Sequence, residues 1–173
     1  MENLQEVIIN KKLIYRGDFL DLYNVDVKLP DGKNHSRDVI MHPGAAAIVA
    51  FLDEENIILV EQFRLPLNRN LLEIPAGKLE NKEDSKKCAL RELEEETGYK
   101  ANNIEYLGKI ATAPGFCDEI IYLYKATSLV KGEKHEDEDE FTKVKIYKLK
   151  EVKEMVKKGE IIDTKTVAMF SYL

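Results

Sequence analysis

The sequence predicts a protein of mixed α/β composition (α+β class), in which a small antiparallel β-sheet precedes a larger sheet that packs against helices. Three observations support this prediction. Runs of β-branched and aromatic residues, separated by turns, fill about the first forty residues. Two continuous apolar runs follow them. A helical pattern then extends from Glu83 to Thr97, and Gly98 stands where a C-terminal cap is expected.

The N-terminal segment predicts three strands, at residues 6–15, 19–29 and 37–41. Between the second and the third, Pro30-Asp31-Gly32 is a typical turn, since proline presets φ and glycine accepts a positive φ. We therefore expect residues 1–42 to form a separate small antiparallel sheet.

The core is expected to begin after His42-Pro43-Gly44. The runs AAAIVAFL and NIILVEQF flank a polar turn, and continuous apolar runs of this length indicate strands buried on both faces. The remaining pattern predicts further strands and two C-terminal helices: strands at 71–75, 104–112, 120–127 and 144–149, and helices at 150–158 and 163–172.

Composition excludes several classes of protein. The 173 residues carry a net charge of −6, which disfavours binding to a nucleic-acid backbone because such binding needs clustered Lys and Arg. The N-terminus lacks the layout of a signal peptide, and no apolar run approaches the roughly 20 residues that span a bilayer. Two cysteines are too few for a disulfide framework. We expect a cytoplasmic protein with no membrane partner.

Acidic side chains gather on one flank of the helix at residues 83–97. At about 100° per residue, Glu92 and Glu96 lie one turn apart with Glu95 beside them, whereas Glu94 points elsewhere. Stacked carboxylates repel each other, but hard divalent cations such as Mg²⁺ and Mn²⁺ prefer oxygen ligands. From the carboxylates alone, a cation site and an ordinary solvated helix face both remain open.

The surrounding spacing favours the cation site. Gly77, five residues, Glu83, seven residues and then the run RELEEETGY at 91–99 resemble the Nudix box of the Nudix hydrolases at every fixed position. The resemblance implies an α/β/α sandwich with a mixed sheet. It also implies hydrolysis of a nucleoside diphosphate linked to another group, with Mg²⁺ as cofactor and Mn²⁺ as an alternative.

The same resemblance assigns roles within the box. It implies that Glu92, Glu95 and Glu96 are metal ligands together with the backbone carbonyl of Ala76. Arg91 would orient these carboxylates, and Arg91 and Glu96 are also counted among the catalytic residues. Three further positions of the motif have structural roles. Gly77 would permit a tight loop, Glu83 would serve the helix dipole or hold the loop, and Gly98 would end the helix.

Outside the box the sequence resembles the ADP-ribose pyrophosphatase group over nearly the whole chain. The matching blocks are HPGA at 42–45, EQFR at 61–64, LEIPAG at 72–77 and APGF at 113–116. Pro114, sixteen residues after Gly98, stands where the enzymes for ADP-ribose carry a proline. The resemblance therefore implies ADP-ribose as substrate. A Nudix hydrolase of a nucleotide sugar or coenzyme A, and an ADP-ribose sensor without activity, are the alternatives.

Residues outside the box would complete the site. Arg64 would bind the substrate phosphates or form a surface ion pair, and Gly115 and Phe116 would line the pocket, with plain packing as the alternative for Phe116. Group members carry a catalytic glutamate in a loop after the box. In the acidic run at 131–140, Glu140 is the first choice for this general base and Glu138 the second.

The N-terminal segment also has a counterpart in this group, whose members resemble homodimers with exchanged N-terminal domains. By this resemblance, residues 1–42 would serve dimerisation and substrate contacts, and residues 43–173 would form the hydrolase domain. Tyr15 and Arg16, with Phe19 and Tyr23, are the candidates for contacts with adenine near the dimer interface, although aromatic strand residues also serve in core packing.

Overall fold

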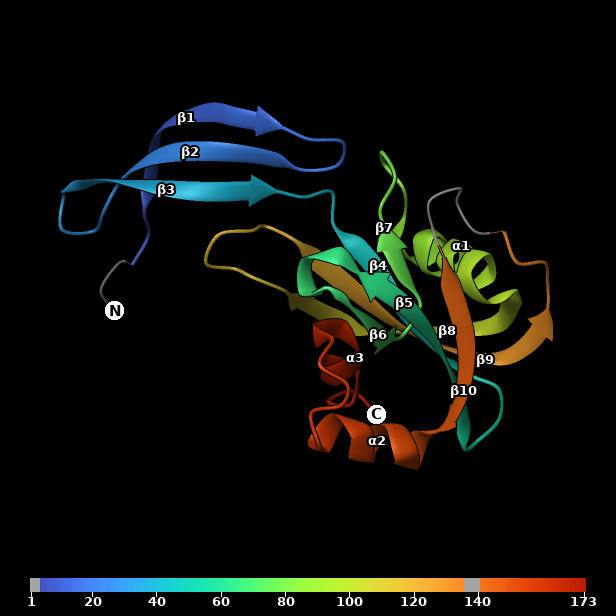
Figure 1. Cartoon of the computed structure of the whole chain (residues 1–173). Coiled ribbons are helices and arrows are strands. Elements are labelled where there is room, and N and C mark those ends of the chain that lie inside the picture. The colour runs from blue at the N-terminus through green and yellow to red at the C-terminus, as the bar shows by residue number, and fades with distance from the viewer. Residues whose placement is uncertain (1–3, 136–140) are drawn as a thin grey trace. The chain divides into compact units, whose positions relative to one another are not determined.

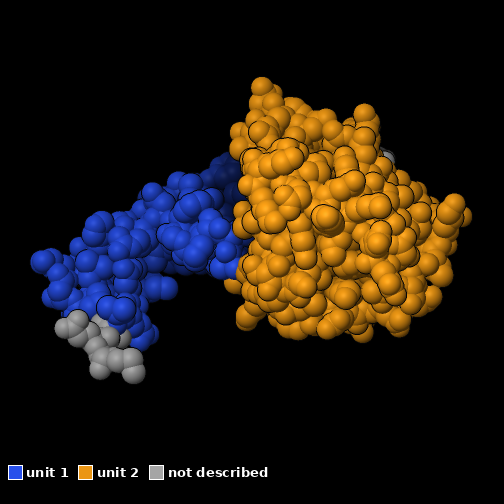
Figure 2. All heavy atoms as spheres, turned by 90° about the horizontal axis from the view of Figure 1, so that it is seen from below, with its two compact units in different colours: residues 1–44, 111–119 blue, residues 45–110, 120–173 orange. Residues whose placement is uncertain are grey.

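The computed structural model describes residues 4–135 and 141–173, and it divides into two compact units (Figure 2). Unit 1 comprises residues 1–44 and 111–119, and unit 2 comprises residues 45–110 and 120–173. The loop at 111–119 therefore joins the N-terminal segment, although it follows the predicted Nudix box in the chain. The sequence pattern predicts a boundary after residue 42, with this loop in the segment 43–173, whereas the structure groups the loop with unit 1.

Unit 1 is a three-stranded antiparallel sheet in the order β1-β2-β3, shown in blue in Figure 1. Its strands are β1 (Val7–Arg16), β2 (Asp21–Lys28) and β3 (Asn34–Met41). Gly32 closes the expected turn between the last two with a φ of 87° and donates its N–H to the Leu29 carbonyl at 2.9 Å. The loop at 111–119 attaches to β3, since the Ile40 N–H donates to the Phe116 carbonyl at 2.7 Å.

Within the described residues, unit 2 contains a mixed seven-stranded sheet in the order β10-β5-β4-β9-β8, with β6 paired to β5 and β7 to β4. The β4–β9 pair is parallel, and the pairs of β4 and β10 with β5 are antiparallel. The strands are β4 (Ala45–Phe51), β5 (Asn56–Arg64), β6 (Arg69–Glu73), β7 (Ala76–Lys78), β8 (Tyr99–Ala111), β9 (Ile120–Lys131) and β10 (Thr142–Lys148). A short 3₁₀ turn, η1 (Leu65–Leu67), connects β5 to β6.

Helices cover both faces of this sheet, as Figure 1 shows for unit 2. They are α1 (Ser85–Thr97), α2 (Leu149–Lys157) and α3 (Thr164–Met169). All seven residues of β4 are buried, and alternate residues face opposite layers. Ala45, Ala47 and Val49 pack in one cluster with residues of α2 and α3, whereas Ala46, Ile48 and Ala50 pack in another with residues of α1. The α/β/α sandwich with a mixed sheet is confirmed.

The layer between the sheet and α1 is built largely from small side chains. Ala46, Ala50 and Ala126 of the strands meet Ala89 and Cys88 of the helix, and each of the five has zero exposed fraction. We call these five small residues the alanine layer; they belong to the buried cluster between the sheet and α1, together with larger residues such as Ile48 and Leu93.

Element bounds differ from the sequence prediction mainly at the ends. Helix α1 begins at Ser85, two residues later than expected, because the Asp84 side chain caps it by accepting from the Lys86 and Lys87 N–H groups. The three-residue strand β7 was not predicted, because it is too short for a periodic pattern. Among the described residues, no helix is both long and apolar enough to cross a membrane.

Candidate active site

Helix α1 presents its acidic flank beside strand β7. Gly98 ends the helix with a φ of 71°, and its N–H donates to the Glu94 carbonyl at 2.7 Å. Two glutamates on this flank are buried, with exposed fractions of 7% for Glu92 and 2% for Glu96. Burial of a carboxylate is costly unless a charged or hydrogen-bonding partner compensates it. The glutamate expected to point elsewhere, Glu94, forms an ion pair with Lys100 at 2.9 Å.

Arg91 is the common partner of three carboxylates. Its Nη1 donates to Glu92 Oε1 at 2.7 Å and to Glu95 Oε2 at 2.8 Å. Its Nε donates to Glu83 Oε1 at 3.0 Å, and its Nη2 donates to Glu83 Oε2 at 3.1 Å and to the Lys78 carbonyl at 3.3 Å. A single guanidinium thus connects the helix to the loop before it and to β7.

The charges in this cluster reinforce one another. Hydrogen bonding to Glu83 raises the pKa of Arg91 far above its ordinary value, against the opposing effect of burial. In return, the Arg91 hydrogen bonds hold the pKa of Glu83 below its ordinary value. Glu83 also accepts from the Glu80 N–H at 3.0 Å, so it holds the loop as well as the arginine. Of the two roles expected for Glu83, these contacts favour holding the loop.

Gly77 lies in strand β7 directly against the Glu92 carboxylate. A Cβ at this position would stand 1.8 Å from Glu92 Oε1 and 2.0 Å from its Cδ. Gly77 does not have a positive φ, so other residues could adopt its backbone conformation. Glycine is needed here because any side chain would collide with Glu92. The expected reason, a tight loop, is therefore replaced by close approach. Next to it, the Ala76 N–H donates to Glu96 Oε2 at 3.2 Å, which brings β7 and the end of α1 together.

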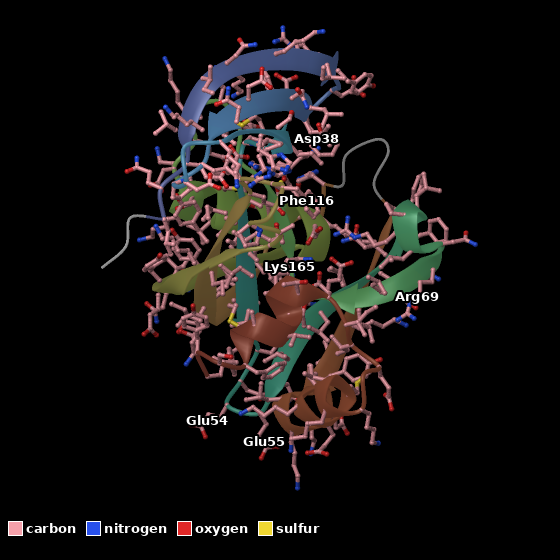
Figure 3. The ribbon with its side chains drawn as sticks, turned by 90° about the vertical axis from the view of Figure 1, so that its left-hand side faces the viewer. Asp38, Glu54, Glu55, Arg69, Phe116 and Lys165 are labelled. Atoms are coloured by element: carbon pink, nitrogen blue, oxygen red, sulfur yellow. The ribbon has the colours of Figure 1, made fainter. Side chains whose placement is uncertain are left out.

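A second charged cluster lies where β5 and β6 meet. Arg64 makes a bidentate contact with Glu73, from Nε to Oε1 at 2.8 Å and from Nη2 to Oε2 at 2.7 Å. Glu73 has an exposed fraction of 1% and also binds Lys165, which is itself buried (Figure 3). Burial alone would raise the pKa of Glu73, but Arg64 and Lys165 outweigh it and hold the pKa below its ordinary value.

The hydrogen bonds to Glu73 raise the pKa of Arg64 above its ordinary value, against the opposing effect of burial, and the charges of Glu73, Asp163 and Glu96 act in the same direction. The ion pair proposed for Arg64 exists, but its partner is a buried carboxylate rather than a surface one. Sequence reasoning gave no role to Glu73 or Lys165. They lie 92 residues apart, and no local pattern connects them.

The general-base candidates Glu138 and Glu140 lie outside the described residues. The flanking residues contact the C-terminal end of α1. The His135 N–H donates to the Glu95 carbonyl at 3.3 Å, and Thr142 Oγ1 donates to the Glu96 carbonyl at 3.4 Å. Lys134 Nζ donates to the Thr142 carbonyl at 2.9 Å and connects the two flanks. Both flanks of the acidic segment therefore bond to backbone carbonyls in the last turn of α1.

The remaining candidates belong to unit 1. Tyr15 and Arg16 are the last two residues of β1. Arg16 Nε contacts Asp21 Oδ1 at 3.3 Å, and the other oxygen of Asp21 accepts from the Tyr23 hydroxyl. Phe19 packs edge-on against His42, with ring centroids 5.7 Å apart.

Gly115 and Phe116 lie in the loop at 111–119, where the Phe116 side chain is exposed (Figure 3). A Cβ at Gly115 would meet no atom within 4 Å. The exposure of Phe116 leaves its side chain available for a ligand, although the backbone of the same residue holds β3.

Comparison with known proteins identifies the family of this arrangement. The profile of the NUDIX domain matches residues 41–170. The chain belongs to the Nudix family. The Nudix chain is 47% identical to an ADP-ribose pyrophosphatase of Bacillus subtilis, with 100% of this chain and 95% of the relative covered. It is 46% identical to a methanol dehydrogenase activator of Bacillus methanolicus, with 98% and 92% covered.

A solved structure shares the Nudix fold. The crystal structure of an ADP compounds hydrolase superposes with a TM-score of 0.85, covering 97% of this chain and 92% of that one. The two sequences are 22% identical, so this similarity concerns the fold.

The donor set of the Nudix box suits a hard divalent cation. Glu92, Glu95 and Glu96 offer carboxylate oxygens only, and the space above Gly77 leaves room for one of these carboxylates to approach β7. Within residues 4–135 and 141–173, no group of three or more acidic, His or Cys side chains converges as a ready metal cluster. Arg91 instead supplies the positive charge that joins two of the carboxylates. The residues fit a divalent metal, as is general in the Nudix family.

Proposed function

We propose that this Nudix protein hydrolyses the pyrophosphate bond of ADP-ribose to AMP and ribose 5-phosphate in the presence of Mg²⁺. The observation that carries the proposal is that the three box glutamates are held beside β7, Glu92 and Glu95 by Arg91 Nη1 and Glu96 by the Ala76 N–H. The full-length relative named ADP-ribose pyrophosphatase supports the choice of substrate.

Each residue of the box would have a distinct task. Glu92, Glu95 and Glu96 would hold Mg²⁺ together with the Ala76 carbonyl, and Arg91 would keep the carboxylates in position. When bound, Mg²⁺ neutralises charge on the pyrophosphate and lowers the pKa of the attacking water. Manganese, with the same preference for oxygen ligands, is the expected substitute.

Two further groups would act on the substrate and the water. Arg64 contacts Glu73 through Nε and Nη2, so the Nη1 edge of its guanidinium is directed away from that pair and would bind a substrate phosphate. Glu140, or Glu138 as second choice, would accept the proton of the attacking water. The flanking residues His135 and Thr142 bond to the Glu95 and Glu96 carbonyls, and these contacts support the choice of a glutamate between them.

The test compares ADP-ribose, ADP-glucose and coenzyme A as substrates in Mg²⁺ and in EDTA, with products separated by chromatography. We expect AMP from ADP-ribose in Mg²⁺ alone. Glu96→Gln should lower kcat by about 10²–10³-fold, the usual loss when a group that stabilises transition-state charge is removed. Glu94→Gln is the matched control on the same helix and should stay near wild type, because Glu94 pairs with Lys100 outside the cluster.

The outcomes separate the alternatives. Cleavage of another substrate in place of ADP-ribose would keep the metal site and reject the substrate assignment. Binding of ADP-ribose without cleavage would favour a sensor. Glu140→Gln and Glu138→Gln, measured beside each other, identify the general base by the larger loss of kcat.

We further propose that the chain forms a cytoplasmic homodimer through unit 1. Strand β1 carries six large exposed hydrophobic side chains, with exposed fractions of 58% for Val7, 65% for Ile8, 54% for Ile9, 38% for Leu13, 53% for Ile14 and 61% for Tyr15. An exposed apolar strand of this kind is typical of an interface. In the dimer, Tyr15 and Arg16 would contact the adenine.

Analytical ultracentrifugation of wild type, Ile8→Glu and the control Lys12→Glu tests the dimer. Ile8→Glu should yield monomer at concentrations where both other proteins sediment as a dimer. A monomeric wild type would reject the proposal.

A further inference from the structure

The C-terminal helix α3 is joined to the strand that leads into the Nudix box. Thr166 is fully buried, and its Oγ1 accepts the Ile74 N–H at 2.9 Å. Lys165, with an exposed fraction of 7%, binds the Glu73 carboxylate. These two contacts reach neighbouring residues of the segment that continues to Ala76, although they come from a helix 92 residues further along the chain.

Asp163 fixes both of these side chains. Its Oδ1 accepts from Lys165 Nζ at 3.0 Å, and its Oδ2 accepts from Thr166 Oγ1 at 2.6 Å and from the Thr166 N–H at 3.0 Å. The same carboxylate therefore caps the helix and orients the two residues that reach β6. Thr166 is thus held at its N–H and at its hydroxyl, and Lys165 is held at its Nζ.

The charges along this route balance. Asp163 and Glu73 supply two negative charges, and Lys165 and Arg64 supply two positive ones, in the order Asp163, Lys165, Glu73, Arg64. Glu73 Oε2 is shared between Lys165 and Arg64 Nη2, whereas Oε1 serves Arg64 Nε. Lys165 shares Glu73 Oε2 with Arg64 and also pairs with Asp163. Arg64 is therefore held by Glu73 alone, and the negative charge of Glu73 is divided between two cations.

We propose that Lys165 and Thr166 are positioning residues for the phosphate-binding arginine. Lys165 orients Arg64 through Glu73, and Thr166 fixes the Ile74 end of the same segment. The inference rests on the proposed function in one respect, since it takes Arg64 to bind a phosphate of the substrate. The new element is that α3, which need not touch the substrate, determines how Arg64 is oriented and how strongly its charge attracts a phosphate.

Loss of the lysine charge has a defined consequence. In Lys165→Met, Arg64 is the one cation left among these four groups, beside the two carboxylates Glu73 and Asp163. Arg64 is then drawn toward the carboxylates, and its attraction for phosphate falls. The carboxylates of α1 remain in place, so substrate binding should suffer more than the chemical step.

The experiment measures kcat and KM for ADP-ribose in Mg²⁺ for wild type, Lys165→Met, Arg64→Met and the double variant. We expect Lys165→Met to raise KM by about 10–100-fold, the usual effect of removing a supporting contact, with kcat within a few-fold of wild type. The double variant should be no worse than Arg64→Met alone, because the lysine acts through the arginine. Lys157→Met, which removes an exposed lysine paired with Glu154, is the matched control.

A second pair of variants keeps the inference testable if Lys165→Met does not fold. Thr166→Val removes the acceptor of the Ile74 N–H at nearly constant volume, and Thr166→Ser retains it. Thr166→Val should raise KM, and Thr166→Ser should restore it toward wild type. A role in stability alone would lower Tm in both lysine and threonine variants and leave KM unchanged.

Calorimetric binding of ADP in Mg²⁺ separates this inference from the proposed function. If wild type releases no AMP from ADP-ribose, the proposed substrate is wrong, and the ADP affinities of the same variants still decide the role of Lys165. The inference is overturned if Lys165→Met binds ADP as tightly as Lys157→Met does. It is equally overturned if its effect multiplies with that of Arg64→Met, or if wild type does not bind ADP.

Discussion

Replacement of Gly77 by alanine is the most direct test of how β7 and α1 cooperate. The new Cβ would lie 1.8 Å from Glu92 Oε1 and 2.4 Å from Oε2, where ordinary contact begins at 3.4 Å. The Glu92 carboxylate must therefore retreat by more than an ångström. It cannot do so while Arg91 Nη1 holds it at 2.7 Å and the side chain is 9% exposed.

The size of the effect follows from these contacts. Loss of one hydrogen bond between charged groups costs about 1.5–3 kcal/mol of stability. A displacement of about 1 Å in a group that must be aligned for catalysis costs about 100-fold in rate. We expect Gly77→Ala to lower kcat by about that factor and to raise the Mg²⁺ concentration needed for half-maximal activity, because Glu92 is a proposed ligand.

The assay is release of AMP from ADP-ribose as a function of Mg²⁺, with Tm recorded on the same samples. Gly159→Ala is the control, because Gly159 has a φ of 72° and no atom within 4 Å of a built Cβ. That control should lose stability and keep kcat. Wild-type kcat and Mg²⁺ dependence in Gly77→Ala would contradict this prediction, since Glu92 would then have no required position against β7.

Three further predictions concern single residues. Cys88 should resist iodoacetamide at pH 8 in the folded protein and react once the protein is unfolded. The reason is that burial, with the charges of Glu83 and Glu92, raises the pKa of its thiol to about 12. Intact-mass measurement checks this, and rapid labelling of Cys88 in the native protein would contradict it. Glu73→Gln should be less stable than wild type at pH 7, and the difference in Tm should shrink as the pH falls below 4.5. A carboxylate whose pKa is lowered on folding contributes stability that protonation removes. A Tm difference that does not depend on pH would show that the charge of Glu73 does not contribute to stability. Gly98→Ala should lower the free energy of unfolding in urea by about 1 kcal/mol, because its φ of 71° is unfavourable for alanine, and an unchanged midpoint would be inconsistent with that backbone strain.

Local chemistry made α1 predictable. Its glycine C-cap and its glutamate spacing are encoded within about fifteen residues, and the buried runs of β4 and β5 are equally local, whereas the Asp84 N-cap was not predicted. The Arg64 cluster was only half predictable, since an ion pair at the surface was one of the two alternatives for Arg64, whereas its buried partner Glu73 was not predicted. Lys165 had no signal, because a buried lysine is rare and its partner lies 92 residues away.

The acidic segment shows a different limit. With acidic residues at most positions between 133 and 140, spacing alone does not single out one glutamate as the base. Gly77 shows a third limit: the motif specified glycine, but the reason for it, contact with Glu92 from the following helix, required the folded arrangement.

The alanine layer beneath α1 ties the catalytic geometry to the composition of the core. Because Ala46, Ala50 and Ala126 have no side chain beyond Cβ, a single larger residue among them would lift the whole helix and carry Glu96 away from the Ala76 N–H. Sequence drift in this layer is thus constrained by activity as well as by stability. We expect new substrate preferences in such proteins to evolve through the surrounding loops, while the residues of the alanine layer keep small side chains.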